Sequence, residues 1–342
     1  MIDSPTRREP EPSPRPRWRR VVRSLTVITG IVVVLAVLAA LGTDWWLRSR
    51  LGGQVEQLPQ ALPTHADRPD KPRHDAMNIL LMGSDKRADG SVAGQRSDTM
   101  MVVHVAADRE RIGVVGIPRD SWVQVPGHGP AKINAAFAWG GPALAVETVE
   151  RLTDVRIDHV AVIDWDGFKA LTDALGGVRI TIPQTVTDGY SGRTWEAGEH
   201  RLDGESALAY VRQRAGLPNG DLDRIKRQQA FLRSLLRQTL STDTFTSPRR
   251  LYDVLDAVTA NLAVDEGWTP AQMRNLAWSL RGVRASDVTF TTVPVKGLGT
   301  EQGQSVVYLD RAAGGELWQA LRDDELSEWI ETTDSGLAET VR

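Results

Sequence analysis

The chain contains no cysteine among its 342 residues, and this absence excludes several kinds of site. Disulfide scaffolds, thiol nucleophiles, thiolate zinc sites and iron–sulfur clusters all require that side chain. The six histidines are scattered singly, with no pair at metal-binding spacing, so a zinc hydrolase is not expected. A Gly-x-Ser-x-Gly elbow, a Walker loop and a Rossmann glycine fingerprint are absent as well. The common hydrolase and nucleotide-binding signatures therefore do not describe this chain.

The net charge is also small, because 41 Lys and Arg residues face 44 Asp and Glu residues and leave a formal charge of -3. A hydrophobic content of 41% and a charged content of 25% are ordinary for a globular protein, which excludes wholesale disorder. The charge is unevenly spread, since residues 1–24 carry seven arginines and only three acidic residues. The small net charge therefore combines a basic tail of +4 with an acidic remainder of −7.

A stretch without any charge follows the basic tail. It runs for 20 residues from Ser24 to Thr43, and as a helix it would span about 30 Å, the thickness of a bilayer core. Two tryptophans follow at the position of an aromatic belt. We therefore expect a single transmembrane helix at 24–43, with residues 1–23 in the cytoplasm and the rest of the chain extracellular. A cleaved signal peptide is the alternative, but its apolar core would be shorter.

The remainder of the chain is expected to hold a linker, one domain and a tail. Prolines among polar residues indicate an extracellular linker at 44–76. Alternating β-rich runs and helical patterns indicate one α/β domain over 77–325. The acidic residues 326–342 predict a flexible tail. The expected strands are 77–82, 99–105 and 111–117 (these two as a hairpin), 159–163, 178–182, 288–295 and 305–309. The expected helices are 143–153, 165–174, 206–212, 221–240, 251–260 and 269–281.

Arginine outnumbers lysine 35 to 6, and codon usage in a GC-rich genome accounts for most of that surplus. It does not explain why arginines recur beside aspartates in loops next to strands. Four such clusters are Gly83–Arg87, Arg96–Thr99, Pro118–Ser121 and the run from Tyr210 to Gln229. A guanidinium group binds phosphate oxygens two at a time, and carboxylates among arginines suit Mg²⁺, which often shares its oxygen ligands with phosphates. The clusters together indicate a pyrophosphate or another dianionic ligand.

The last cluster lies on an expected helix. Asp221, Arg224 and Gln228 fall at i, i+3 and i+7, so they line one face near the helix N-terminus, where phosphate is favoured. Any one cluster alone is most often a surface ion pair or a turn. Their joint order along the chain is the stronger signal.

In that order the clusters resemble the LytR-CpsA-Psr family of cell-wall enzymes. The resemblance runs from about residue 77 to about residue 240. The motifs that carry it are G-S-D-K-R, R-S-D-T-M, I-P-R-D-S, K-I-N-A-A-F-A-W-G-G, D-A-L-G-G-V, L-D-G-E-S-A-L-A-Y-V-R-Q-R and D-L-D-R-I-K-R-Q-Q. The resemblance implies a single three-layer α/β sandwich with a central mixed sheet, preceded by the transmembrane helix. It also implies an apolar pocket for a polyprenyl chain.

A reaction and its residues are implied too. Enzymes of this family transfer a glycopolymer from a polyprenyl-pyrophosphate carrier to a peptidoglycan hydroxyl, which forms a phosphodiester. Asp85 and Asp98 match the ligands of Mg²⁺, for which Mn²⁺ is a substitute. The residues that match the pyrophosphate site are Arg96, Arg119, Arg212, Arg214, Arg224 and Gln228. The expected partners are the lipid-linked glycopolymer, peptidoglycan and membrane lipid, with no nucleic acid.

The catalytic assignment leaves alternatives open. Arg119 is expected to stabilise charge on the transferred phosphate. Asp120 and Asp221 are the candidate general bases, and a reaction without a general base is the third alternative. A pyrophosphatase that gives the attack to water would use the same site, and a regulatory module could bind polyprenyl lipid without turnover. The polymer itself, whether arabinogalactan, teichoic acid or a capsule-like polysaccharide, is not specified by the sequence.

Five further residues have two interpretations each. Lys132 and Asn134 either orient the catalytic groups or simply close a turn. Phe137, Phe168 and Leu171 either face the lipid or, in the favoured interpretation, pack in the core.

Overall fold

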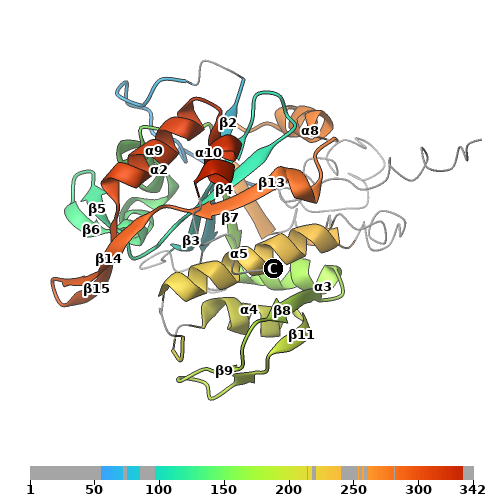
Figure 1. Ribbon diagram of the computed structural model, residues 1–342. Coiled ribbons are helices and arrows are strands. Elements are labelled where there is room, and N and C mark those ends of the chain that lie inside the picture. The colour runs from blue at the N-terminus through green and yellow to red at the C-terminus, as the bar shows by residue number, and fades with distance from the viewer. Residues whose placement is uncertain are drawn as a thin grey trace, which may run out of the picture.

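A seven-stranded mixed sheet runs through the centre of the protein in the computed structural model (Figure 1). The structure describes residues 55–71, 75–84, 97–213, 215–217, 221–239, 253, 256–257, 261–280 and 282–333. In spatial order the strands are β1 (Glu56–Leu58), β12 (Leu262–Asp265), β7 (His159–Asp164), β2 (Met77–Ser84), β3 (Ser97–Val105), β4 (Ile112–Ile117) and β13 (Val288–Thr292). The expected hairpin of 99–105 with 111–117 is confirmed as the antiparallel pair β3–β4.

The strand directions bring several chain ends to one edge of the sheet. β2 is parallel to β7, and β4 is parallel to β13. β3 lies between β2 and β4 and is antiparallel to both. The carboxyl ends of β2, β4, β7 and β13 therefore meet the amino end of β3 at one edge, which we call the carboxyl edge.

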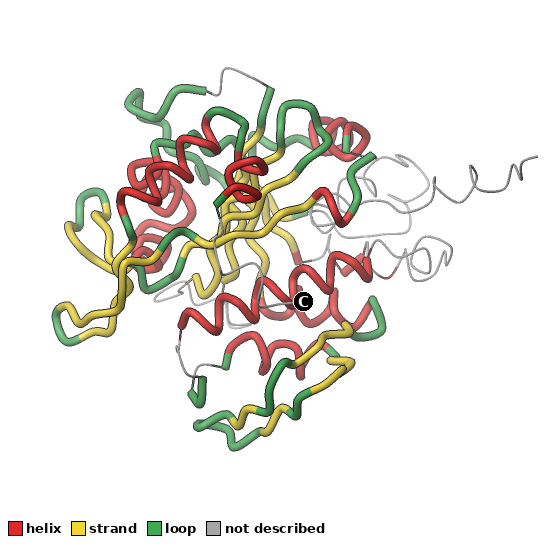
Figure 2. The backbone as a smooth tube through the Cα atoms, viewed as in Figure 1, coloured by secondary structure: helices red, strands yellow, loops and turns green. Residues whose placement is uncertain are grey.

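Helices cover both faces of this sheet, as Figure 2 shows. One face packs against α3 (Trp165–Ala174), α4 (Gly204–Arg212), α5 (Asp221–Thr239) and α8 (Pro270–Ser279). The other packs against α2 (Ile133–Thr153), α9 (Arg311–Arg322) and α10 (Leu326–Thr332). The helices of each face bury their apolar stripes against alternate residues of the same strands, which produces two cores. The expected α/β fold with a central mixed sheet is confirmed.

Four small sheets and a 3-10 turn lie outside the central sheet. The pairs are β5 (Trp122–Val125) with β6 (Gly129–Lys132), β8 (Val178–Ile182) with β11 (Gly198–Leu202), β9 (Val186–Thr187) with β10 (Thr194–Trp195), and β14 (Val295–Glu301) with β15 (Gln304–Leu309). The turn is η3 (Ala285–Asp287). The expected strand 178–182 forms, but it pairs with β11 rather than joining the central sheet. The single strand expected at 288–295 is wrong, because the chain leaves β13 at Thr292 and begins β14 at Val295.

The helix expected at 143–153 is also longer than the pattern indicates. α2 begins at Ile133 and contains a kink at Gly140 and Gly141, both with non-helical backbone angles. Gly141 has a φ of 62°, which a residue with a side chain rarely adopts. The glycine pair and Pro142 break the helical pattern in the sequence and hide the first segment of the helix.

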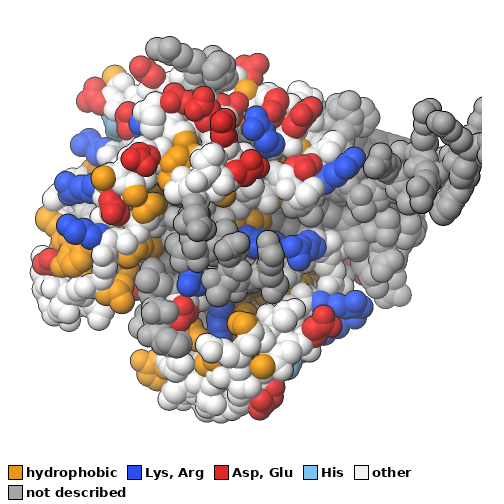
Figure 3. All heavy atoms as spheres, in the orientation of Figure 1, with side chains coloured by type: hydrophobic (Ala, Val, Ile, Leu, Met, Phe, Trp, Pro, Cys, Tyr) orange, Lys and Arg blue, Asp and Glu red, His pale blue; other side chains and the backbone are white. Residues whose placement is uncertain are grey.

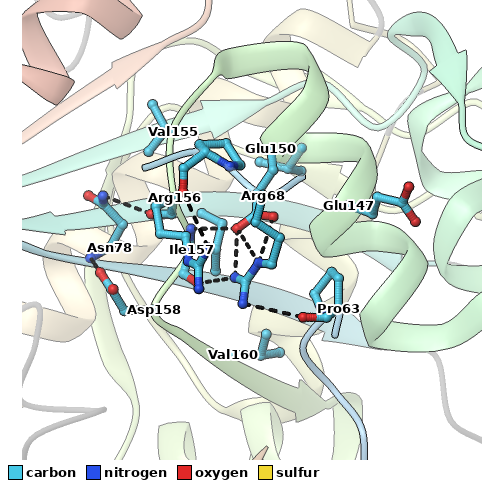
Figure 4. Close-up of polar contacts among 12 residues, drawn as sticks. Pro63, Arg68, Asn78, Glu147, Glu150, Val155, Arg156, Ile157, Asp158 and Val160 are labelled. Atoms are coloured by element: carbon cyan, nitrogen blue, oxygen red, sulfur yellow. Dashed lines mark hydrogen bonds and ion pairs between the residues drawn. The ribbon is translucent and has the colours of Figure 1, made fainter. Parts of the chain in front are cut away.

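The N-terminal part of the domain corrects the expected linker, which is wrong for residues 55–71. β1 adds to the central sheet through parallel pairing with β12. Arg68 then anchors the segment, because its Nη2 lies 2.7 Å from Glu150 Oε1 and its Nε lies 2.9 Å from Glu150 Oε2. The same guanidinium group donates to the Ile157 carbonyl oxygen, and all these groups point toward one another in Figure 4. The domain therefore starts well before residue 77.

The expected tail is likewise wrong for its first residues. α10 covers 326–332, and Leu326 is only 1% exposed in the core above β4. The Asp324 carboxylate just before it contacts the buried His104 Nε2 at 2.8 Å and accepts a hydrogen bond from the Ala107 backbone N–H. Apolar and acidic residues are mixed in α10, which makes the helix amphipathic. The acidic composition of 326–342 as a whole is typical of a flexible tail and hides this helix. Residues 334–342 lie outside the described part.

Two expected helices fall largely or wholly beyond what the structure describes. These are the transmembrane segment 24–43 and most of 251–260. None of the helices within the described ranges has both the length and the apolar character that a membrane span needs.

The Arg68–Glu150 contact generates a stability prediction. Both side chains are nearly inaccessible, at 7% and 2%, so Glu150→Ala would leave a buried guanidinium without its counter-charge. We expect this change to lower the free energy of unfolding by about 3–5 kcal/mol in urea titrations.

The matched control is Arg151→Ala. Arg151 contacts Glu147 at a similar distance of 2.9 Å, but it is 61% exposed. Its loss is expected to cost about 0–1 kcal/mol. Equal losses of stability from Glu150→Ala and Arg151→Ala would contradict the role of the Arg68–Glu150 contact as an anchor of the N-terminal segment.

Candidate active site

Polar residues from β2, β3 and β7 lie side by side at the carboxyl edge. Ser84, the last residue of β2, pairs with Ser97 of β3 on one side and with Asp164 of β7 on the other. Gly83 pairs with Thr99, so Asp98 is the extra residue of a β-bulge. Bulges often re-aim a side chain beside an active site. The sequence therefore places one expected metal ligand in this bulge and the other, Asp85, directly after the strand end that faces it.

Several of the expected site side chains are not described by the structure. Asp85, Arg96 and Arg214 lie outside the described residues, and so do the side chains of Asp98 and Asp221. Among the residues that are described, no three His, Asp or Glu side chains are placed to hold a metal ion. The metal assignment stays a prediction from the sequence.

Arg119 and Asp120 form a tightly held turn just after β4. The Pro118 carbonyl accepts from the Ser121 N–H at 3.0 Å, and the Arg119 carbonyl accepts from the Asn134 N–H at 3.2 Å. The Asp120 carbonyl accepts from the Val307 N–H at 2.9 Å. A bond within the turn and bonds from α2 and β15 therefore fix the backbone from which the two side chains project.

The Asp120 carboxylate is engaged by two cations. Its Oδ1 lies 2.9 Å from Lys132 Nζ, and its Oδ2 lies 3.7 Å from Arg119 Nε. The two side chains that flank it, like Asp120 itself, are 13–20% exposed. The interpretation of Lys132 as an orienting residue is supported, because its Nζ contacts the Asp120 carboxylate. Asn134 instead closes the turn, because its contact is made by the backbone N–H.

Arg212 approaches the same edge from the opposite face of the sheet. It is the last residue of α4, and its guanidinium carbon lies 5.3 Å from the ring centroid of Trp165. Trp165 begins α3 immediately after β7, while Asp164 caps that helix by accepting from the Gly167 N–H. The indole thus holds an exposed arginine beside the end of β7 through a cation–π contact.

The first turns of α5 present a row of buried polar residues. Arg224, Arg227, Gln228 and Gln229 are 3–9% exposed. Gln228 Nε2 donates to the Val211 carbonyl at 3.4 Å, which ties α5 to the end of α4. Gln229 Nε2 donates to the Thr291 carbonyl and to Thr292 Oγ1, both at 2.8 Å, which ties α5 to the end of β13. α5 therefore brings the expected Arg224 and Gln228 to the carboxyl edge.

Arg227 is the residue whose role the sequence analysis missed. Its Nη1 donates to Gln213 Oε1 at 2.7 Å, and its guanidinium group lies over the Tyr210 ring at 4.5 Å. Burial lowers the pKa of Arg227 from its usual value, but the group remains charged. It holds Gln213, which follows Arg212 at the end of α4. A second arginine within the motif D-L-D-R-I-K-R-Q-Q was the available signal.

The apolar candidates behave as core residues. Leu171 is 2% exposed and Phe137 is 8% exposed, each within one of the two cores. Phe168 packs against Phe231 with their ring centroids 5.1 Å apart. The favoured interpretation of these residues as core packing is confirmed.

The arrangement concentrates positive charge. Arg119 comes from β4, Arg212 from α4 and Arg224 from α5, and Figure 3 shows Lys and Arg side chains along the border between the sheet and the α4–α5 layer. Fixed guanidinium groups around one strand edge suit an anion with several oxygens.

A comparison with protein families decides the relationship. The model of the LytR_cpsA_psr family matches residues 55–323. The chain belongs to this family. The match begins at β1 and ends beside α10, so its limits agree with the domain seen in the structure.

Individual LytR_cpsA_psr relatives extend this finding. The cell wall biosynthesis protein LcpA of Corynebacterium glutamicum is 36% identical over 279 residues, which are 69% of this chain and 53% of LcpA. This chain therefore spans about half the length of LcpA. The probable cell wall biosynthesis protein LcpB of the same organism is 33% identical over 310 residues, 87% of this chain and 71% of LcpB. The polyisoprenyl-teichoic acid–peptidoglycan teichoic acid transferase TagU of Halalkalibacterium halodurans is 29% identical and covers 84% of this chain and 99% of its own.

Solved structures share the fold. A structure of TagT bound to LI-WTA has a TM-score of 0.59 at 25% identity and covers 77% of this chain and 98% of its own. A LytR-Csp2A-Psr enzyme from Actinomyces oris has a TM-score of 0.63 at 20% identity, with 79% and 96% covered. At that identity the second likeness shows the fold alone.

The position of Arg227 generates a prediction for the site. Arg227→Met removes a charge-assisted hydrogen bond and a cation–π contact from a buried place, and we expect it to lower the free energy of unfolding by about 2–4 kcal/mol. Arg237→Met, at an exposed position of the same helix, is expected to change that free energy by less than about 0.5 kcal/mol. Urea unfolding measures both, and a neutral Arg227→Met would refute its structural role.

Proposed function

We propose that this chain is a membrane-anchored phosphotransferase that moves a glycopolymer from a polyprenyl-pyrophosphate carrier to a peptidoglycan hydroxyl. One observation carries the proposal: Arg119, Arg212 and Arg224 come from three separate elements and meet at one edge of the sheet in a chain of this family. The relative TagU is a teichoic acid–peptidoglycan transferase by name, which supports the reaction class. The related TagT was solved with LI-WTA bound, which supports a wall polymer as ligand.

The proposed reaction breaks the pyrophosphate bond. A peptidoglycan hydroxyl attacks the phosphorus that bears the glycopolymer, a new phosphodiester bond forms, and polyprenyl phosphate leaves with the electron pair of the broken P–O bond. Arg119 stabilises the charge that develops on the transferred phosphoryl oxygens, while Arg212 and Arg224 hold the pyrophosphate. Since backbone bonds from α2 and β15 fix the Arg119–Asp120 turn, the Arg119 charge needs little reorganisation in the transition state.

Asp120 is assigned a positioning role. Its carboxylate bridges Lys132 and Arg119, so it orients the catalytic guanidinium group and would have to give up these contacts to accept a proton from substrate. Asp221 remains the candidate general base. It begins α5, three residues before Arg224.

Magnesium is part of the proposal. Carboxylates are hard oxygen ligands of the kind Mg²⁺ prefers, and the bulge at Asp98 faces the strand end that precedes Asp85. These two residues would hold the ion, which when bound supplies charge neutralisation for the pyrophosphate. The proposed location is the outer face of a cell membrane, with residues 24–43 as the anchor.

The acceptor assay tests the proposal. Labelled lipid-linked polymer is supplied with and without peptidoglycan, and the label transferred to peptidoglycan is measured. We expect transfer that depends on the acceptor, and we expect Arg119→Ala to slow it roughly 10²- to 10³-fold. Arg111→Ala is the control and should leave the rate unchanged, because Arg111 is exposed and directly precedes β4, at the end of that strand opposite to Arg119. Release of free sugar phosphate at the same rate with and without acceptor would instead indicate a pyrophosphatase.

The metal assignment has its own test. Asp85→Asn and Asp98→Asn each remove one anionic ligand, so we expect both variants to need a much higher Mg²⁺ concentration for half-maximal transfer. Chelation with EDTA should abolish transfer by the unaltered protein, and added Mg²⁺ or Mn²⁺ should restore it. An unchanged Mg²⁺ dependence in both variants would contradict the assignment.

A further inference from the structure

Trp139 is an exposed aromatic residue that the proposed reaction does not use. Its side chain is 50% exposed, and large apolar side chains with so much exposure are few among the described residues. The indole ring stacks on the imidazole of His128, with ring centroids 4.7 Å apart and an angle of 29° between the planes. One face of the indole is thus supported by a partner ring, which fixes the orientation of the other.

The backbone explains why this ring is presented outward. Trp139 ends the first segment of α2, because Gly140 and Gly141 leave the helical conformation immediately after it. Gly141 has a positive φ that only glycine adopts without strain, so the break is built into the chain. His128 lies at the tip of the β5–β6 hairpin, which packs against the same helix. Two rigid elements therefore hold the ring pair.

Both elements are rooted in the Arg119–Asp120 turn. The N–H of Asn134, in the first turn of α2, donates to the Arg119 carbonyl, and Lys132 at the end of β6 contacts Asp120. Trp139 follows Asn134 by five residues, which corresponds to about 8 Å along a helix. The ring pair lies on the α2 side of the sheet, whereas Arg212 and Arg224 reach the edge from the opposite face. It therefore lies on the α2 side of the proposed phosphate site, on two elements whose other ends contact the Arg119–Asp120 turn.

We propose that Trp139, backed by His128, is a stacking platform for a pyranose ring of the glycan that is transferred or of the glycan that accepts it. This inference rests on the proposed function. The C–H groups on one face of a pyranose carry partial positive charge and favour the negative face of an aromatic ring. The hydroxyl groups around the sugar need polar surroundings, and the exposed His128 that stacks on the indole is one polar group at the platform.

The surroundings favour a sugar over a lipid chain. The ring that stacks on the indole is the imidazole of His128, a polar group from a turn that also contains Gly127 and Gly129. Leu298 is another exposed large apolar residue, but it lies on the β14–β15 hairpin opposite Val307 and supplies no ring. It therefore serves as a control for general apolar contact.

The kinetic test uses the full chain with lipid-linked polymer as donor and purified peptidoglycan strands as acceptor. We expect Trp139→Ala to raise the KM for one of the two glycans roughly three- to tenfold, with a smaller effect on kcat. Trp139→Phe keeps a ring and should stay within about twofold of the unaltered protein. The glycan whose KM changes identifies which sugar stacks on the platform.

A binding test is independent of turnover. Saturation-transfer NMR with soluble peptidoglycan fragments and with delipidated wall polymer should show contact to one of them, and Trp139→Ala should abolish it. The two proposals can therefore fail separately. If the protein only hydrolyses its donor but Trp139→Ala still abolishes the glycan contact, the platform is supported and the transferase proposal is refuted.

Two results would overturn the platform. The first is Trp139→Ala with unchanged KM values and unchanged binding of both glycans. The second is an equal effect of Trp139→Ala and Leu298→Ala on attachment to lipid vesicles, with no effect on either glycan, which would indicate a membrane contact instead.

Discussion

The antiparallel position of β3 between two otherwise parallel strand pairs is the constraint on which the site depends. Because β3 is antiparallel to β2 and β4, its first residues lie at the edge where those two strands end. Ser84 at the end of β2 and Ser97 at the start of β3 are therefore neighbours at the carboxyl edge. A fully parallel sheet would send Ser97 and Asp98 to the far edge, away from Arg119. The register of hydrogen bonds between strands therefore decides which charged residues can share a ligand.

The arginines at this edge differ in burial and in their contacts, and the sequence alone does not distinguish them. Arg227 is buried and fully engaged by Gln213 and Tyr210, so it shapes the segment that follows α4. Arg212 is exposed and rests on an aromatic ring, so its donors remain directed toward solvent and any ligand there. Burial costs a charged group its hydration, and only the arginines with protein partners are buried deeply. The site thus combines supporting guanidinium groups with ligand-directed ones.

Local pattern in the sequence was enough for most of the central sheet and for the order of the motifs. Strands such as 99–105 and helices such as 165–174 carry their periodicity within a few residues, and they were predicted correctly. Non-local contacts were not accessible: Arg68 and Glu150 are 82 residues apart, and β1 is too short to show alternation. The charge pair of Asp120 with Lys132 was likewise invisible until the β5–β6 hairpin brought the two together.

The early start of the domain, at β1 and Arg68, limits the length of chain between the domain and the proposed membrane anchor. With β1 built into the sheet from Glu56 and the proposed anchor ending at Thr43, only residues 44–55 are left between bilayer and domain. A fully extended chain of that length reaches at most about 40 Å. If the chain is anchored as proposed, this short connection keeps the domain close to the lipid surface. An insertion of flexible residues there would lengthen the connection and leave every contact within the domain unchanged.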